Sequence, residues 1–335
     1  MFTIPGYGEK KDMCDFVKAY ISCPGQHMVK PVKQSCQRIE CPECYLDWAS
    51  KASGRITDVL RGSQAAYRNV DTDLVTDYKQ AIKNKKMVRR VNHFVLSPPP
   101  GFVGDDFNLN GLYRRLYLFM KRNHLFTGGL VIFHPYRLKS DIRKRLQAII
   151  KENSNNVDIR DTGGLWALVH EDILCLGSLS AYVNFSPHFH FLAFGGLPNA
   201  TDFYRKTGWV YKNIGRRDTA IRIDEKTGAI IDEIRSTAKY LLSHCCVQSN
   251  ENGRLYKTYR FFGLCSPARI RVQKEFGVPV IRKVYESFLK CPVCGERLVH
   301  CAPIEGVYSP YKDGKGEYRF VKTKIVFRKY EVIEK

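Results

Sequence analysis

Two histidines, His188 and His190, lie two residues apart in the apolar stretch SPHFHFLAFG. Successive side chains of a β-strand point to opposite faces, so the two imidazoles would share one face of such a strand. Phe189 and Phe191 would share the other face and be buried against the core. A strand that offers two imidazoles on one face has a geometry for holding a metal ion, although such a pair also occurs often without function, and two imidazoles leave an ion short of ligands.

A helix expected over 229–245 carries side chains that could complete this site. Its apolar residues recur at helical spacing, and Tyr240 and His244, four residues apart, lie on one face. If the helix packs on the histidine face of the strand, the tyrosine hydroxyl lies beside an ion held by the histidine pair and His244. Glu233 and His134 are alternative third ligands, although a structural or phosphate-facing role is favoured for His134.

These residue types are sufficient to cut a phosphodiester. A divalent ion on the histidines would polarise the non-bridging oxygens of the phosphate, and the Tyr240 hydroxyl would attack phosphorus. The products are a covalent phosphotyrosine and a free 3′ hydroxyl. Because the covalent bond keeps the energy of the phosphodiester, the reverse reaction can rejoin the strands without ATP. Chemistry at phosphate favours Mg²⁺ and imidazole ligands favour Mn²⁺, so either ion is expected.

The balance of charged residues predicts a polyanionic partner. The chain of 335 residues has 54 Lys and Arg against 33 Asp and Glu, a formal net charge of +21. Phosphates neutralised by such a surface release counterions, which favours binding. The sequence shows no amphipathic basic helix of the kind that binds membranes, so nucleic acid is the favoured partner. Basic residues interleaved with aromatic rings are typical of a single-strand-binding surface, with a solvated sheet edge as the alternative. The residues assigned to this surface are Arg137, Arg205, Lys206, Trp209, Lys212, Arg216, Arg217 and Lys239.

The cysteines predict structural zinc. No run is apolar enough to span a membrane, and the N-terminus, MFTIPG, lacks the regions of a signal peptide, so a cytoplasmic protein with reduced thiols is expected. Two Cys-x-x-Cys knuckles, CPEC and CPVCG, have the spacing of zinc ligands. The first set is Cys23, Cys36, Cys41 and Cys44, with His27 as an alternative to Cys23, and the second is Cys291, Cys294, Cys265 and Cys301, with His300 as a competitor. Free thiols are the alternative, and Cys14 belongs to neither set.

Strands and helices interleave over about 90–245, with several strands in succession. This pattern predicts an α+β domain built on one mostly antiparallel sheet packed by helices. The expected organisation is an N-terminal zinc-binding segment over 1–67, a basic linker over 68–90, the α+β domain over 91–260, and a C-terminal region with the second zinc knuckle and a basic tail over 261–335.

The order of these motifs resembles that of the HUH endonuclease superfamily. The strand PHFHFLAFG is followed by a tyrosine-bearing helix, TAKYLLSH, and HFVLSPP is similar to the family's first motif. Within the superfamily the chain most resembles the rolling-circle replication initiators of plasmids and viruses, particularly the archaeal type, over about 90–265. One departure is that many plasmid initiators carry Tyr-x-x-Lys, whereas here the nearest lysine is Lys239.

The resemblance implies a five-stranded antiparallel sheet with a ferredoxin-like or RRM-like core and the paired histidines on a central strand. It implies Tyr240 as the nucleophile, single-stranded or hairpin origin DNA as the substrate, and a host helicase and polymerase as partners. A transposase or conjugative relaxase with the same chemistry is one alternative. A zinc-stabilised nucleic-acid-binding regulator without catalysis is another, and it leaves the histidine pair and the tyrosine–histidine face as coincidences.

Overall fold

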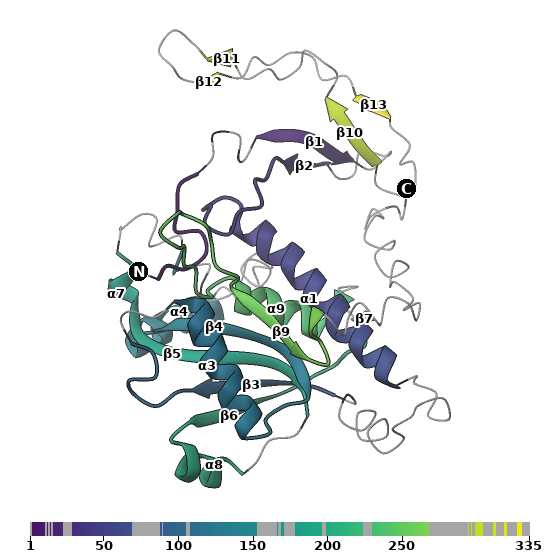
Figure 1. Cartoon of the computed structure of the whole chain (residues 1–335). Helices are drawn as coiled ribbons and strands as arrows, with labels where there is room; N and C mark the ends of the chain where they lie inside the picture. The colour runs from purple at the N-terminus through teal and green to yellow at the C-terminus, as the bar shows by residue number, and fades with distance from the viewer. Residues whose placement is uncertain are drawn as a thin grey trace. The chain divides into compact units, whose positions relative to one another are not determined.

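The computed structural model describes most residues between 2 and 267 and short stretches beyond them (Figure 1). The described residues are 2–10, 12, 14, 16–22, 29–68, 88, 90–104, 108–152, 166, 169–170, 178–195, 199–223, 230–267, 294, 296, 299–303, 311–312, 318–319 and 327–329. The chain separates into a larger compact unit, Met1–Glu9 with Gln37–Pro279, and a smaller one, Lys10–Cys36 with Val280–Lys335. Most of the predicted linker falls outside the described residues.

The larger unit is built on a five-stranded sheet in which every neighbouring pair is antiparallel. Its strands, in spatial order, are β6 (Val210–Arg217), β3 (Val91–Ser97), β5 (Val183–Phe194), β4 (Gly128–Leu138) and β9 (Tyr259–Gly263). The histidine-bearing strand β5 is therefore the central one (Figure 1). The predicted α+β class with an antiparallel sheet and packed helices is confirmed.

The phenylalanine face of β5 is covered by α3 (Leu109–Arg122). Asn108 caps this helix by accepting from the Gly111 amide, which satisfies one of the unpaired N–H groups of the first turn. Apolar side chains at helical spacing form a continuous cluster with the sheet. Its fully buried members include Leu112, Tyr113, Leu116, Phe133, Phe189 and Phe191. Removal of these apolar side chains from water is a main source of stability on the phenylalanine face of the sheet.

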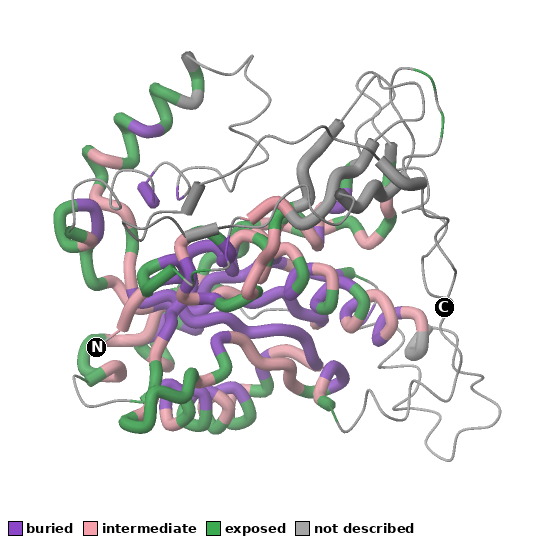
Figure 2. Tube along the Cα trace, turned by 90° about the horizontal axis from the view of Figure 1, so that it is seen from above, coloured by how far each residue is buried: buried purple, intermediate pink, exposed green. Residues whose placement is uncertain are grey.

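The histidine face is covered by α1 (Tyr45–Arg68) and α9 (Glu233–Leu242), which pack against each other. Their buried residues form one core cluster with Leu192 and Phe194 of β5. Because α1 contributes to this core, it belongs to the larger unit and not to a separate N-terminal segment ending at residue 67. Figure 2 shows that buried residues concentrate in the strands and on the helix sides that face them.

The N-terminus of α9 is held by an ion pair. The Asp232 carboxylate caps the helix by accepting from the Arg235 amide at 2.9 Å. The Arg61 guanidinium of α1 donates to both Asp232 oxygens, at 2.9 and 3.0 Å. The helix begins at 233 and not at 229, because Ile230 and Ile231 form the short strand β8, which pairs with β7 (Arg222–Ile223). The Arg61–Asp232 ion pair therefore attaches α9, the helix that carries Tyr240, to α1.

Three further helices belong to the larger unit. They are α4 (Ser140–Glu152), α7 (Leu179–Tyr182), which leads directly into β5, and α8 (Ala200–Thr207), which precedes β6. Leu146 of α4 packs with Trp166 and Tyr182 in a third apolar cluster. Within the described part of the chain, no helix has the length and apolar composition needed to cross a bilayer.

The smaller unit joins segments from both ends of the sequence. Its four-stranded sheet has the order β13 (Phe327–Lys329), β10 (Val299–Pro303), β1 (Val17–Ser22) and β2 (Val29–Lys33). Strands β1 and β10 pair antiparallel, with Tyr20 opposite Cys301. A separate two-stranded ribbon pairs β11 (Tyr311–Lys312) with β12 (Tyr318–Arg319). The two terminal regions, predicted as separate domains, therefore share one sheet.

Candidate active site

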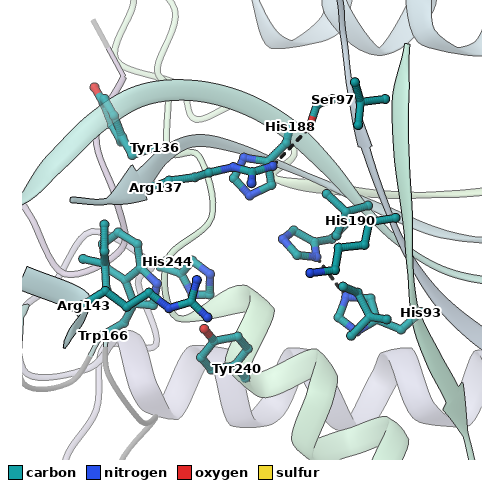
Figure 3. Close-up of a pocket in the computed structure, with 15 residues that line it drawn as sticks. His93, Ser97, Tyr136, Arg137, Arg143, Trp166, His188, His190, Tyr240 and His244 are labelled. Atoms are coloured by element: carbon teal, nitrogen blue, oxygen red, sulfur yellow. Dashed lines mark hydrogen bonds between the residues drawn. The ribbon is translucent and has the colours of Figure 1, made fainter. Parts of the chain in front are cut away.

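A pocket of about 480 Å³ opens on the histidine face of the central sheet (Figure 3). Side chains from β3, β4, β5 and β6 line it, together with residues of α4 and α9 and the rings of Trp166 and His244. The tyrosine helix packs on the histidine face of β5, which is the arrangement that the site requires, since Tyr240, His188 and His190 all line this pocket. The pocket lies entirely within the larger unit.

Three histidines form a metal-binding geometry. One ring nitrogen from each of His134, His188 and His190 lies within 4.8 Å of the others. His134 of β4 is directly opposite His188 in the strand register, so both side chains point to the same face of the sheet. His134, which the sequence reasoning held only as an alternative ligand, is therefore the third member. His244, the expected third ligand, follows the end of α9 and lies outside this group, although its ring contacts that of His134.

The imidazoles of the triad are neutral, and His188 offers a free lone pair. His188 Nδ1 is 2.7 Å from the Ser186 carbonyl oxygen, and because a carbonyl only accepts, Nδ1 carries the hydrogen and Nε2 keeps a lone pair. Burial lowers the pKa of His188 to about 4 and, with the neighbouring histidines, holds the pKa values of His134 and His190 well below their usual range. Neutral imidazole is the form that binds a metal.

His134 gives the clearest indication that the site fits a metal ligand. Its side chain is fully buried, and neither of its ring nitrogens has a hydrogen-bond partner among the described residues. A buried polar group without a partner costs roughly 1 to 3 kcal/mol, so native proteins rarely keep one without a reason. A cation held between His134, His188 and His190 would satisfy one of these nitrogens, and three imidazoles suit a divalent transition metal. The residues present therefore fit a metal ion.

A β-bulge in β5 shapes the site. Between the pairs His134–His188 and Tyr136–Phe185 the register shifts by one residue, so that Ser186 and Pro187 together oppose a single residue of β4. A bulge is one of the few places where proline is tolerated in a central strand, because the ladder is already interrupted there. The bulge presents the Ser186 carbonyl to His188 and turns Phe185 to the pocket face, opposite Tyr136.

A second layer of hydrogen bonds lies behind His190. His93 Nε2 is 2.9 Å from His190 Nδ1, and Arg217 Nη2 donates to His93 Nδ1 at 3.1 Å. Arg217 is itself fixed by a bond from Nε to the Thr237 hydroxyl of α9. Burial, and then the positive charge of Arg217, lower the pKa of His93 to about 4. The sequence reasoning missed His93, although alternation within the first motif, where it shares a face with Val95 and Ser97, could have indicated it.

Tyr240 lies in the last turn of α9, and its side chain is 38% exposed at the pocket. Partial burial raises the pKa of its hydroxyl, and the positive charge of Arg143 beside it opposes that rise (Figure 3). The His244 ring contacts the rings of Tyr240 and His134 at centroid distances of 4.8 and 4.4 Å. It also stacks on Trp166 at 4.7 Å. His244 therefore lies between the phenol and the histidine triad.

Glu233, the other alternative ligand, is occupied elsewhere. Its carboxylate accepts from the Asp218 amide at 2.9 Å and from Arg222 at 2.7 Å, at the first turn of α9. Tyr240 is in the last turn of the same helix, seven residues further along, so Glu233 is about two helical turns from it. It does not line the pocket.

Cations line the pocket beside the histidines. They are Arg137, whose Nη2 donates to the Ser97 hydroxyl at 3.0 Å, Arg143 and Lys212. Arg137 and Lys212 were assigned to the DNA-binding surface from the sequence. Arg143 and the Trp166 ring were missed, because neither differs in its local sequence from other basic or aromatic residues. The three positive charges suit a phosphate group.

The remaining residues assigned to DNA binding have different surroundings. Trp209 is only 3% exposed and stacks on Phe119 at 4.3 Å, so it belongs to the apolar core and not to a binding surface. Arg217 lies in the hydrogen-bond network behind His190. The others lie outside the pocket lining: Arg205 and Lys206 on the exposed side of α8, Arg216 at the end of β6, and Lys239 on α9.

The sulfur atoms of Cys14, Cys36, Cys41 and Cys44 lie within 4.8 Å of one another, which is a possible zinc-binding set. The fourth sulfur belongs to Cys14, which the sequence reasoning had left out, whereas the expected Cys23 lies outside the described residues. Cys14 could not be predicted as a member because the Cys-x-x-Cys spacing does not indicate which cysteines, distant in the sequence, the fold brings to it.

The second predicted zinc set is not assembled in the described residues. Cys265 is fully buried in the core on the histidine face, and burial raises the pKa of its thiol to about 12, with a hydrogen bond to Ser63 opposing the rise. Cys265 is a core side chain and belongs to none of the metal-binding groups found among the described residues, which argues against its assignment as a zinc ligand. Cys291 lies outside the described residues, Cys294 is exposed, and Cys301 is on β10.

The pocket thus combines neutral imidazoles, a phenol and three cations, a set able to hold a divalent ion and a phosphodiester. Comparison of the chain with family models, curated proteins and solved structures found no match. Its function is therefore inferred from its own residues.

Proposed function

We propose that this protein is an HUH-type endonuclease that nicks and rejoins single-stranded DNA to initiate rolling-circle replication. The observation that carries the proposal is that the Tyr240 phenol lines the same pocket as His188 and His190, which form the triad with His134. Support also comes from the order of the sequence motifs, the position of the histidine pair on the central strand, and the net charge of +21.

His134, His188 and His190 would hold the divalent ion. Mn²⁺ suits three imidazole nitrogens and Mg²⁺ suits the phosphate oxygens, so both are candidates. When bound, the ion would polarise the non-bridging oxygens of the scissile phosphate. Arg137 of β4 and Lys212 of β6 also line the pocket and would position the DNA backbone by pairing with its phosphates.

In the cleavage step, the Tyr240 hydroxyl oxygen forms a bond to phosphorus, and the bond between phosphorus and the 3′ oxygen breaks. The 3′ oxygen takes up a proton and leaves as a free hydroxyl, while the 5′ side of the cut stays attached as a phosphotyrosine. Arg143 would stabilise the phenolate that develops on Tyr240. The reverse step, attack by a 3′ hydroxyl on the phosphotyrosine, would rejoin the strands.

His244 is the candidate to accept the phenolic proton. Burial holds its pKa well below the usual range, so the ring is neutral. The Ser243 hydroxyl donates to the Tyr240 carbonyl and therefore accepts from His244 Nδ1, which leaves a lone pair on Nε2. The stacked Trp166 ring fixes the plane of the imidazole.

The proposal is tested by incubating the protein with Mn²⁺ and labelled single-stranded DNA that carries candidate origin sequence. A covalent protein–DNA adduct is expected on a denaturing gel, and it should be lost in Tyr240→Phe and in the double variant His188→Ala/His190→Ala. Tyr204→Phe, an exposed tyrosine on α8, is the matched control and should keep the adduct.

Two outcomes would contradict the proposal. An adduct that survives Tyr240→Phe would exclude this tyrosine as the nucleophile. Tight DNA binding without any adduct would favour the non-catalytic regulator. The replication role is tested separately, by asking whether the protein nicks a supercoiled plasmid only when the plasmid carries the candidate origin; equal nicking without it would argue against an initiator.

A further inference from the structure

We propose that Phe185 and Tyr136 form a stacking site for one nucleobase of the bound strand, at the edge of the pocket. The ligand class rests on the proposed function, because the strand that crosses the pocket is taken to be DNA. The site itself rests on separate residues, which take no part in cleavage.

The two rings are brought together by the β-bulge at Ser186 and Pro187. In an unbroken strand, alternation would turn Phe185 to the face opposite that of His188, into the core with Phe189. The extra residue places Phe185 opposite Tyr136 instead, and Tyr136 lines the pocket (Figure 3). Re-aiming a side chain beside a functional site is a known use of a bulge.

The rings are braced before any ligand arrives. Phe185 and Tyr136 meet edge to face with centroids 6.2 Å apart, and Phe2 lies parallel to Phe185 at 6.1 Å. The Tyr136 hydroxyl donates to the Phe2 carbonyl at 3.2 Å. Aromatic side chains held in this way lose little further conformational entropy when a ring stacks on them.

Phe185 is nevertheless open to solvent. It is 52% exposed, and of the phenylalanines whose side chains the structure describes, only this one is exposed. A lone exposed ring would need no explanation. Here it is held on a central strand, by a bulge, three residues from His188, where an ordinary register would have buried it.

The charge around these rings identifies the kind of ligand. Arg137 follows Tyr136 directly and lines the pocket with Arg143 and Lys212, so an aromatic surface adjoins a cluster of cations. Single-strand-binding surfaces combine these features, because cations pair with the backbone while bases stack on rings. The area of two rings is small for a protein partner, whereas it matches one base.

The test uses metal-free protein carrying Tyr240→Phe, so that no cleavage takes place, and a short oligothymidylate as the probe. Phe185→Ala should weaken binding about tenfold, as expected for the loss of one base stack. Phe185→Trp should bind as tightly as the parent. Tyr204→Ala, which removes an exposed ring from α8, should leave the affinity unchanged.

An abasic strand of the same length separates stacking from other effects. Phe185→Ala and the parent should bind it equally, with the same salt dependence, because no charge has been removed. With 5-iododeoxyuridine in place of thymidine, ultraviolet light should crosslink the strand to Phe185 or Tyr136. Phe185→Leu, which keeps an apolar side chain without a ring, covers the case in which the alanine variant fails to fold.

Unchanged oligothymidylate affinity in Phe185→Ala and Phe185→Leu, or an equal loss on the abasic strand, would overturn the site. Crosslinks found only at other residues would also do so. These outcomes are independent of nicking. If the Phe185 variants weaken binding as expected but protein that keeps Tyr240 forms no adduct, the stacking site stands and the proposed chemistry is overturned. If the adduct forms but the Phe185 variants bind as tightly as the parent, the chemistry stands and the stacking site is overturned.

Discussion

His93 and His190 share a hydrogen bond of 2.9 Å, from Nε2 of the first to Nδ1 of the second. Because the guanidinium of Arg217 can only donate to His93 Nδ1, His93 must carry its hydrogen on Nε2 and donate it to His190. A neutral His190 then carries its own hydrogen on Nε2. For His190 to bind a metal through Nε2, both histidines must change tautomer, and His93 Nδ1–H would then face Arg217.

Replacement of Arg217 should therefore tighten metal binding. In Arg217→Gln the obligatory donor is gone, and His190 can donate from Nδ1 to His93 without conflict. We expect an affinity for Mn²⁺ about tenfold higher, within the range typical of residues behind metal ligands. Isothermal titration calorimetry measures it. Arg216→Gln, which removes an exposed charge one residue away, is the control for electrostatics alone, and an equal gain there would refute the tautomer argument.

His134 should affect metal binding and apoprotein stability in opposite directions. His134→Leu removes a ligand of the triad and should lower Mn²⁺ affinity by more than about tenfold. It also removes two buried nitrogens without partners, so the metal-free variant should be more stable by roughly 1 to 2 kcal/mol in urea denaturation. A less stable apoprotein would mean that ordered water already satisfies His134.

His244→Ala should keep the Mn²⁺ affinity and lose the covalent protein–DNA adduct.

The buried histidines predict a loss of apoprotein stability in acid. The pKa values of His93 and His188 are lowered to about 4 in the folded protein, against about 6.5 in an unfolded chain. Between these values the unfolded state binds more protons, so stability falls as the pH falls below about 6.5. The loss at pH 5 should be on the order of 2 kcal/mol for each histidine. Urea denaturation with chelator at pH 7.5 and pH 5 tests this, and equal stabilities would contradict the burial of neutral rings.

The Arg61–Asp232 pair should contribute strongly to stability because it holds the N-terminus of α9. The two side chains are about 10% and 9% exposed, and the pair is bidentate. Arg61→Ala leaves a buried carboxylate without its cation and should cost roughly 3 kcal/mol. Arg61→Lys keeps the charge but cannot donate twice, so an intermediate loss is expected. Chemical denaturation of both variants measures the difference, and a loss below 1 kcal/mol in Arg61→Ala would indicate a surface-like pair.

Zinc content should distinguish the observed cysteine cluster from other thiols. Cys14→Ser should lower the zinc content of purified protein, because Cys14 lies with Cys36, Cys41 and Cys44. Cys265→Ser is the matched control, since this thiol is buried in the core and its raised pKa disfavours the thiolate that zinc requires. Elemental analysis measures both. Equal zinc content in Cys14→Ser and the parent protein would exclude Cys14 as a ligand.

Local periodicity was enough to predict part of this site. The i, i+2 spacing of His188 and His190 places both rings on one face of β5, and Tyr240 lies on the helix that meets this face. His244 also lines the pocket, but it follows the end of α9, so helical spacing did not determine its place. The apolar residues of α9 also predicted which side it buries. These features depend on the geometry of a single strand or a single helix, which the sequence determines on its own.

The partners of these residues were decided by the tertiary structure. His134 joins the triad because the register sets it opposite His188, and His93 reaches His190 from another neighbouring strand. Phe185 lies opposite Tyr136 because of a bulge that alternation alone cannot predict. Strand register, bulges and the packing of Trp209 depend on contacts between residues far apart in the chain. The spacing of residues along one strand or helix does not contain these contacts. The sequence therefore determined β5 and α9 as the elements that carry the site, and the tertiary structure determined which residues surround their side chains.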